Sequence, residues 1–153
     1  MNRIEKVREY VDDILIHMED VEERRCAYVH LYGVSQACTM IAMKRNDNVE
    51  LATIAGMLHD IYSYDTMDRI DHAHNGAVMA YDLLRKMDIF DENEIDIICS
   101  AIYNHSDKHI THSAFDEILK DADVFQHYLY NPLFDVAEHE KERLERLKKE
   151  FDL

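Results

Sequence analysis

Apolar residues recur every three or four positions along most of the chain, which is the spacing of one buried face of an α-helix. This pattern predicts helices over residues 3–18, 20–45, 51–60, 72–87, 91–105, 114–129 and 134–151. Asp20, Asp71 and Asp91 stand at the start of three of these segments. They are predicted N-caps, because an aspartate accepts hydrogen bonds from the first backbone N–H groups of a helix. The polar stretches 61–69 and 106–112 are predicted loops, and we expect the first to lie over a site.

The composition favours a single all-α domain. The chain has 153 residues but only 3 Gly and 1 Pro, so folds built of strands and tight turns are disfavoured. One domain over residues 1–153 fits this length, and no repeat or linker divides it. Gly33 lies inside a predicted helix, which indicates that another helix approaches closely there. The last helix, 134–151, is amphipathic and charged, and it packs either on the core or on a second subunit, so a homodimer is one expectation.

Charge and cysteine usage exclude some classes of function. The net charge of −15 opposes binding to long nucleic acid or to an anionic membrane, because attraction to phosphate backbones is missing. No apolar run is long enough to span a bilayer, and the N-terminal residues lack the apolar segment of a secretory signal. The three cysteines, Cys26, Cys38 and Cys99, are scattered among apolar residues, which predicts buried free thiols. A cytoplasmic location is therefore expected.

Potential metal ligands stand at or beside the buried side of five predicted elements. They are His30, the His59–Asp60 pair, His72 or His74, His105, and Asp121 or Asp123. The helical pattern does not choose between His72 and His74, or between Asp121 and Asp123, since both members of each pair flank the buried face. Any one of these residues alone is typical of a hydrogen-bonded core histidine or a solvated carboxylate. Together they indicate a metal site, because imidazole and carboxylate are the usual donors and are costly to bury without a partner.

The order His, His-Asp, Asp resembles the HD-domain metal-dependent phosphohydrolase superfamily, over about residues 24–128. Met57-Leu58-His59-Asp60 resembles the motif that names the superfamily. Asp121-Ala122-Asp123-Val124-Phe125 looks like its closing Ala-Asp-apolar motif, which implies Asp123 as the ligand. His72-Ala73-His74-Asn75-Gly76-Ala77 resembles an element of the branches that bind two metals, which implies His72. Ala101-Ile102-Tyr103-Asn104-His105 looks like the later histidine motif of those branches.

The resemblance implies an HD-type helical bundle with a metal site between its helices. The implied ligands are His30, His59, Asp60, His72, His105 and Asp123, holding one or two divalent transition metals. Fe, Mn, Co, Ni and Zn are the expected ions, because imidazole-rich sites suit them. The implied function is hydrolysis of a small phosphorylated substrate, such as a nucleotide, by a metal-activated water. His59 and Asp60 would stand at its catalytic centre, and Lys108 is a candidate for clamping a phosphate.

Departures from the superfamily's branches leave the substrate open. The run Ile61-Tyr62-Ser63-Tyr64-Asp65 lacks the lysine common in the dinucleotide-polyphosphate branch, and no Gly-Tyr-Pro follows, as in cyclic-dinucleotide enzymes. The paired acids of alarmone hydrolases are also absent. Two other functions fit the pattern: a diiron oxygenase with a similar His/Asp set, and a regulatory module that binds a nucleotide without hydrolysing it. Oxygen-dependent turnover would identify the first, and binding without hydrolysis the second.

Overall fold

The chain is all-α in the computed structural model, which describes residues 2–153 and has no strand among them. In chain order the helices are α1 (Arg3–Ile16), α2 (Val21–Arg45), α3 (Val49–Leu58), α4 (Ile61–Thr66), α5 (His72–Met87), α6 (Glu92–Asn104), α7 (Ala114–Tyr130), the 3₁₀ turn η1 (Glu138–Glu140) and α8 (Lys141–Glu150). The predicted fold class is confirmed. Among residues 2–153, no helix combines the length and the apolar character needed to cross a bilayer.

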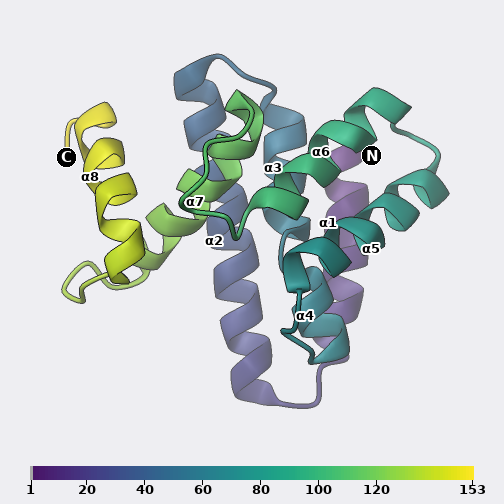
Figure 1. The fold of residues 1–153 in the computed structure, drawn as a ribbon. Coiled ribbons are helices and arrows are strands. Elements are labelled where there is room, and N and C mark those ends of the chain that lie inside the picture. The colour runs from purple at the N-terminus through teal and green to yellow at the C-terminus, as the bar shows by residue number, and fades with distance from the viewer. Residues whose placement is uncertain (1) are drawn as a thin grey trace.

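Helix α3 lies at the centre of the bundle. Its residues from Leu51 to Leu58 are all buried, and it packs against α1, α2, α6 and α7 (Figure 1). Such a helix has no polar face, which is why its sequence is the most apolar of the chain. At Gly33 on α2, an added Cβ would lie 2.8 Å from Gln126 Cγ of α7. The predicted close approach of another helix at Gly33 is thus confirmed.

Two predicted element boundaries are wrong. Residues 61–66 were expected in a loop but form α4, because Ile61 is fully buried and draws this turn of chain into the core. The last helix was expected over 134–151 but begins at Lys141, after the short turn η1. The residues that anchor it are Leu144 and Leu147, whereas Phe134 is 72% exposed and gives the preceding segment no buried face.

The N-cap predictions hold at two positions and fail at one. Asp20 accepts from the backbone N–H groups of Glu22 and Glu23, and Asp91 forms a complete capping box. Asp71 makes no capping hydrogen bond, because its backbone is left-handed, with φ of 49°, and its carboxylate instead lies 2.8 Å from His74 Nδ1.

Two of the three cysteines predicted to be buried are not. Cys26 is exposed and Cys99 is half-buried, so only Cys38 is a buried free thiol. Leu129 is 51% exposed, since it lies in the last turn of α7 beside the exposed Tyr130.

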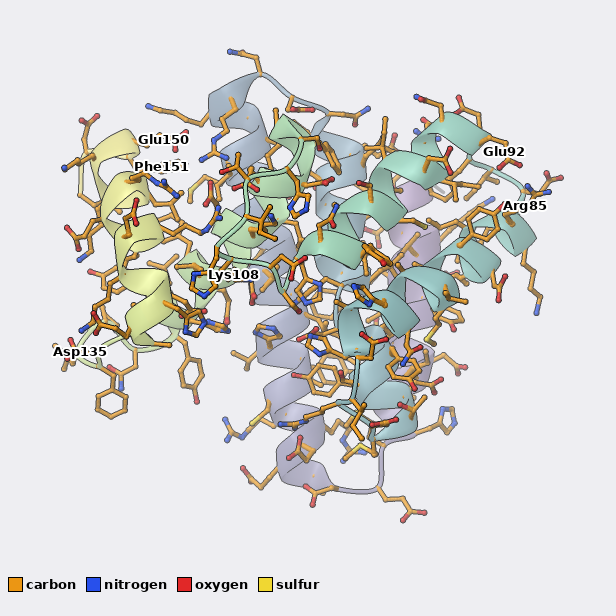
Figure 2. The ribbon with its side chains drawn as sticks, in the orientation of Figure 1. Arg85, Glu92, Lys108, Asp135, Glu150 and Phe151 are labelled. Atoms are coloured by element: carbon orange, nitrogen blue, oxygen red, sulfur yellow. The ribbon has the colours of Figure 1, made fainter. Side chains whose placement is uncertain are left out.

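Helix α8 packs on α7, at the side of the molecule opposite α5 (Figure 1). Side chains labelled in Figure 2 mark the two sides, with Glu150 by α8 and Arg85 by α5.

Candidate metal centre

The six predicted ligands come together between five helices. His30 lies in the middle of α2 and Asp123 in the middle of α7. The others stand at helix ends: His59 is the C-cap of α3 and is followed by Asp60, His72 opens α5, and His105 is the C-cap of α6. Gly76 lets α5 approach this point, because a Cβ there would lie 3.3 Å from the carbonyl oxygen of His59. Residues far apart in the sequence therefore share one site.

His30, His59 and one oxygen of Asp60 form a first group. The Nε2 atoms of His30 and His59 are 3.1 Å apart. Asp60 Oδ2 lies 3.3 Å from His30 Nε2 and 3.5 Å from His59 Nε2. Asp123 Oδ1 closes the group at 3.6 Å from His30 Nε2 and 3.9 Å from His59 Nε2.

His72, His105 and the other oxygen of Asp60 form a second group. The Nε2 atoms of His72 and His105 are 3.2 Å apart. Asp60 Oδ1 lies 3.4 Å from His72 Nε2 and 3.2 Å from His105 Nε2. Asp60 therefore stands between two histidine pairs and offers one carboxylate oxygen to each.

The donor set fits metal ions better than it fits a network of hydrogen bonds. Two imidazole nitrogens bound to one tetrahedral ion at about 2.1 Å lie about 3.4 Å apart, close to the separation within each pair. The carboxylate atoms Asp60 Oδ1 and Asp123 Oδ1 are buried and accept no hydrogen bond, although histidine nitrogens lie nearby. Unpartnered buried oxygens are costly unless a cation satisfies them. The residues present thus fit one or two divalent metals.

Hydrogen bonds at the opposite ring nitrogens orient three of these histidines. The Nδ1 atoms of His59 and His105 lie 2.8 Å and 2.6 Å from the carbonyl oxygens of Gly56 and Ile102, three residues earlier. His30 Nδ1 lies 2.9 Å from Gln126 Oε1. Donation of the Nδ1 proton to these acceptors leaves the Nε2 lone pair facing the cluster, which is the tautomer a metal ligand needs.

The electrostatics of the cluster keep its carboxylates charged and His59 neutral. Burial raises the pKa of Asp60, but the surrounding imidazoles of His59, His105 and His30 outweigh it and hold that pKa well below its usual range. Burial likewise opposes ionisation of Asp123, yet Lys108 and His59 outweigh burial and hold the pKa of Asp123 well below its usual range. Full burial lowers the pKa of His59 to about 4. Anionic carboxylates beside neutral imidazole are the protonation states that bind metals.

The structure separates the alternatives that the helical pattern left open. His72 lies in the second group, whereas His74 pairs with Asp71 and stacks on Tyr103, with ring centroids 3.9 Å apart. Asp123 faces the histidines. Asp121, two residues earlier, accepts from Arg143 and Arg45 on another side of α7, so it is not in the cluster.

Lys108 lies against the cluster, but its ammonium is already engaged. Its Nζ is 2.6 Å from Asp123 Oδ2 and 2.7 Å from the carbonyl oxygen of His105, and the side chain is only 6% exposed. Figure 2 shows Lys108 on the side of the bundle that faces α8, where Arg143 donates to its carbonyl oxygen. Lys108 therefore neutralises Asp123 in this structure, and its role in clamping a phosphate stays a prediction.

A cavity of about 390 Å³ opens onto the cluster. His30, Asp60 and His72 line one part of it, and Ser63, Tyr64, Arg69 and His127 line the rest. Helix α4 and the segment after it thus border the site, as expected for residues 61–69. Arg69 pairs with Glu23 at 3.0 Å and remains 71% exposed, so its guanidinium can turn toward a ligand.

Two residues that were not predicted, His127 and Gln126, both touch the cluster. Gln126 orients His30, and His127 Nε2 lies 3.3 Å from Asp123 Oδ1. A signal for His127 was present, because it follows Asp123 by four residues and thus shares its helix face. No sequence pattern indicated Gln126, because its partner His30 is 96 positions away in the chain.

Comparisons with known proteins show the family and the fold of the chain. The family model described as HD domain matches residues 27–128. A solved structure, described as a predicted HD superfamily hydrolase from an uncultured Thermotogales bacterium, superimposes with a TM-score of 0.64 at 23% identity. That match covers 99% of this chain and 94% of the other, and at this identity it shows a shared fold. No curated protein matches the chain.

Proposed function

This chain belongs to the HD domain family, and on that premise we propose that it is a metal-dependent phosphohydrolase acting on a nucleotide or another small phosphate ester. One observation carries the proposal: each carboxylate oxygen of Asp60 faces its own pair of histidine Nε2 atoms. A shared carboxylate between two nitrogen pairs suits two ions held side by side, the arrangement used in many phosphate-ester hydrolases.

The residues divide into two ligand sets. His30, His59, Asp60 and Asp123 would hold one ion, and His72, His105 and Asp60 the other. Imidazole-rich sets favour Fe, Mn, Co, Ni or Zn over Mg. When bound, such ions supply Lewis acidity toward phosphoryl oxygens and activate water as the nucleophile.

The protein's own side chains would position the substrate. The cavity of about 390 Å³ accepts a small phosphate ester, and Arg69 on its lining offers a guanidinium that matches phosphate geometry. Lys108 holds Asp123 in its charged form and fixes the loop after α6 through the carbonyl oxygen of His105. Ser63 and Tyr64 also line this cavity, where a leaving group would lie.

The test is elemental analysis of the purified protein, wild type beside Asp60→Ala, followed by hydrolysis of a panel of nucleotides and aryl phosphate esters. We expect about two equivalents of transition metal in the wild type and a clear loss in the variant. Hydrolysis should fall at least about 10³-fold, because the shared ligand is gone.

Other outcomes would change the proposal. About one equivalent in the wild type would favour a mononuclear site at His30 and His59. A wild type that binds no metal after reconstitution would overturn the proposed function. Metal binding without hydrolysis of any ester would favour a binding module, and oxygen-dependent turnover with bound iron would favour an oxygenase.

A further inference from the structure

His127 extends the cluster beyond the six predicted ligands. It lies on α7 one turn after Asp123, and its Nε2 is 3.3 Å from Asp123 Oδ1. Its ring stacks on His30, with centroids 5.5 Å apart and planes inclined by 15°. His127 also lines the same cavity as His30 and Asp60.

A buried carboxylate orients His127 from behind. Glu140 of η1 lies with Oε1 3.0 Å from His127 Nδ1, and its side chain is only 6% exposed. The hydrogen bond places the proton on Nδ1 and leaves the Nε2 lone pair toward Asp123. His30, His59 and His105 are oriented in the same way, with an acceptor at Nδ1. A carboxylate behind an imidazole is a recurrent support for metal-binding histidines.

The environment of Asp123 Oδ1 independently indicates a cation at this point. This oxygen is buried and accepts no hydrogen bond, although it lies between His30 Nε2 at 3.6 Å and His127 Nε2 at 3.3 Å. Donor atoms of His30, Asp123 and His127 all lie within 4.8 Å of one another. An unpartnered buried carboxylate oxygen flanked by two imidazole nitrogens points to a cation between them.

We propose that His127 is a further metal ligand on the His30 and Asp123 side of the centre, with Glu140 as its positioning residue. The ligand is a divalent transition metal, and the inference rests on the metal centre of the proposed function. Glu140 belongs to the turn before α8, so the C-terminal segment takes part in building the site. The segment matched by the HD domain model ends at residue 128, and Glu140 lies outside it.

A simple ion pair that fastens η1 to α7 is the competing explanation, and His17 shows what such a contact looks like. His17 also follows an aspartate, Asp13, by four residues, but through Nδ1 at 3.6 Å and with its side chain 75% exposed. No second imidazole stacks on it among the aromatic pairs of residues 2–153. His17 is therefore the matched control for the geometry of His127.

The experiment compares metal binding by wild type, His127→Phe, Glu140→Gln and the control His17→Phe. Phenylalanine keeps a ring beside His30 but removes the nitrogen donor. Affinity for Zn²⁺ and Co²⁺ would be measured by chelator competition, and stoichiometry by elemental analysis. We expect His127→Phe to bind the ion at His30 and Asp123 about 10- to 100-fold less tightly, or to lose that ion. Glu140→Gln should lose less metal affinity than His127→Phe, and His17→Phe should bind metal as tightly as wild type.

The visible spectrum of the Co²⁺-loaded protein provides a second readout, because it depends on the number and type of ligands. It should change in His127→Phe and remain as in wild type in His17→Phe. Wild-type affinity and spectrum in His127→Phe, with only a lower Tm, would overturn the inference and leave the ion pair. If His127→Phe does not fold, His127→Ala carries the same expectation, and an unchanged Co²⁺ spectrum in His127→Ala would count against the inference. A wild type that binds neither ion would instead refute the metal centre itself.

Discussion

Helix α7 carries two buried charge clusters that differ in how they are satisfied. On one side Asp121 accepts from Arg45 at 2.6 Å and from Arg143 at 2.7 Å. We call this the α8 cluster; it comprises Arg45, Glu117, Asp121, Arg143 and Glu150. On the other side Asp123 faces the histidines, and the oxygen nearest to them accepts no hydrogen bond.

The α8 cluster is closed, because each of its buried carboxylate oxygens has a cationic partner. Glu117 accepts from Lys120 and Arg143, and Asp121 uses both oxygens on arginines. The metal centre is open: its buried carboxylates outnumber its one nearby ammonium, Lys108. A closed cluster fastens α8 to α7, whereas an open one has capacity for a cation. On the same helix, the structural cluster has all its buried carboxylate oxygens paired with cations, whereas the candidate functional cluster does not.

Asp121→Ala should break the closed cluster with the largest effect. The substitution leaves Arg143, whose side chain is 6% exposed, and Arg45 without their shared carboxylate. We expect a loss of about 3–5 kcal/mol in the free energy of unfolding, measured by urea titration, with metal content unchanged. Asp60→Ala should behave in the opposite way, losing metal with little change in stability. Metal loss in Asp121→Ala while the protein stays folded would contradict the separation of the two clusters.

Lys108→Met should open the metal centre further. Removal of the ammonium leaves Asp123 buried beside histidines alone, so the metal-free protein should lose about 2–3 kcal/mol of stability. Because a bound cation takes over the neutralisation, added metal should raise Tm more in this variant than in wild type. Differential scanning calorimetry with and without Zn²⁺ measures both quantities. If Lys108 acts only as a phosphate clamp, stability will stay as in wild type and KM will rise.

Gln126→Ala should weaken the metal centre without opening either cluster. Loss of the acceptor at His30 Nδ1 frees the ring to rotate and change tautomer. We expect about a 10-fold loss in metal affinity, near 1.4 kcal/mol, by chelator competition. Gln126→Glu keeps an acceptor at this position and is the control. Equal losses in the two variants would show that an acceptor at His30 Nδ1 is not what matters.

Acid should weaken the closed cluster through Glu117. Burial alone would raise the pKa of Glu117, but Lys120 and Arg143 lower it to about 2. A carboxylate with a depressed pKa stabilises the fold above its unfolded pKa of about 4.5, and this contribution is lost as the pH falls toward 2. Urea unfolding at several pH values below 5 should show this decline. The decline should be shallower in Arg143→Met, and an equal slope in both proteins would argue against the pairing.

Local patterns along the chain determined most of the helices and their caps. The spacing of apolar residues predicted α2 and α5 almost to the residue, and the predicted N-cap at Asp91 marked the start of α6. These features depend on contacts within a few positions, so the sequence contains them directly. The His59–Asp60 pair at the end of the most apolar helix likewise indicated where a site would form.

Tertiary structure decided what each polar side chain faces. Asp121 and Asp123 flank the buried stripe equally in sequence, and only the packing of α8 and α2 on α7 assigns one to arginines and the other to histidines. The helical conformation of residues 61–66 and the positions of Gln126 and Glu140 beside the histidines were equally hidden. Their partners lie on other elements, and distances between elements are set by the packing of the whole core, which no local pattern encodes.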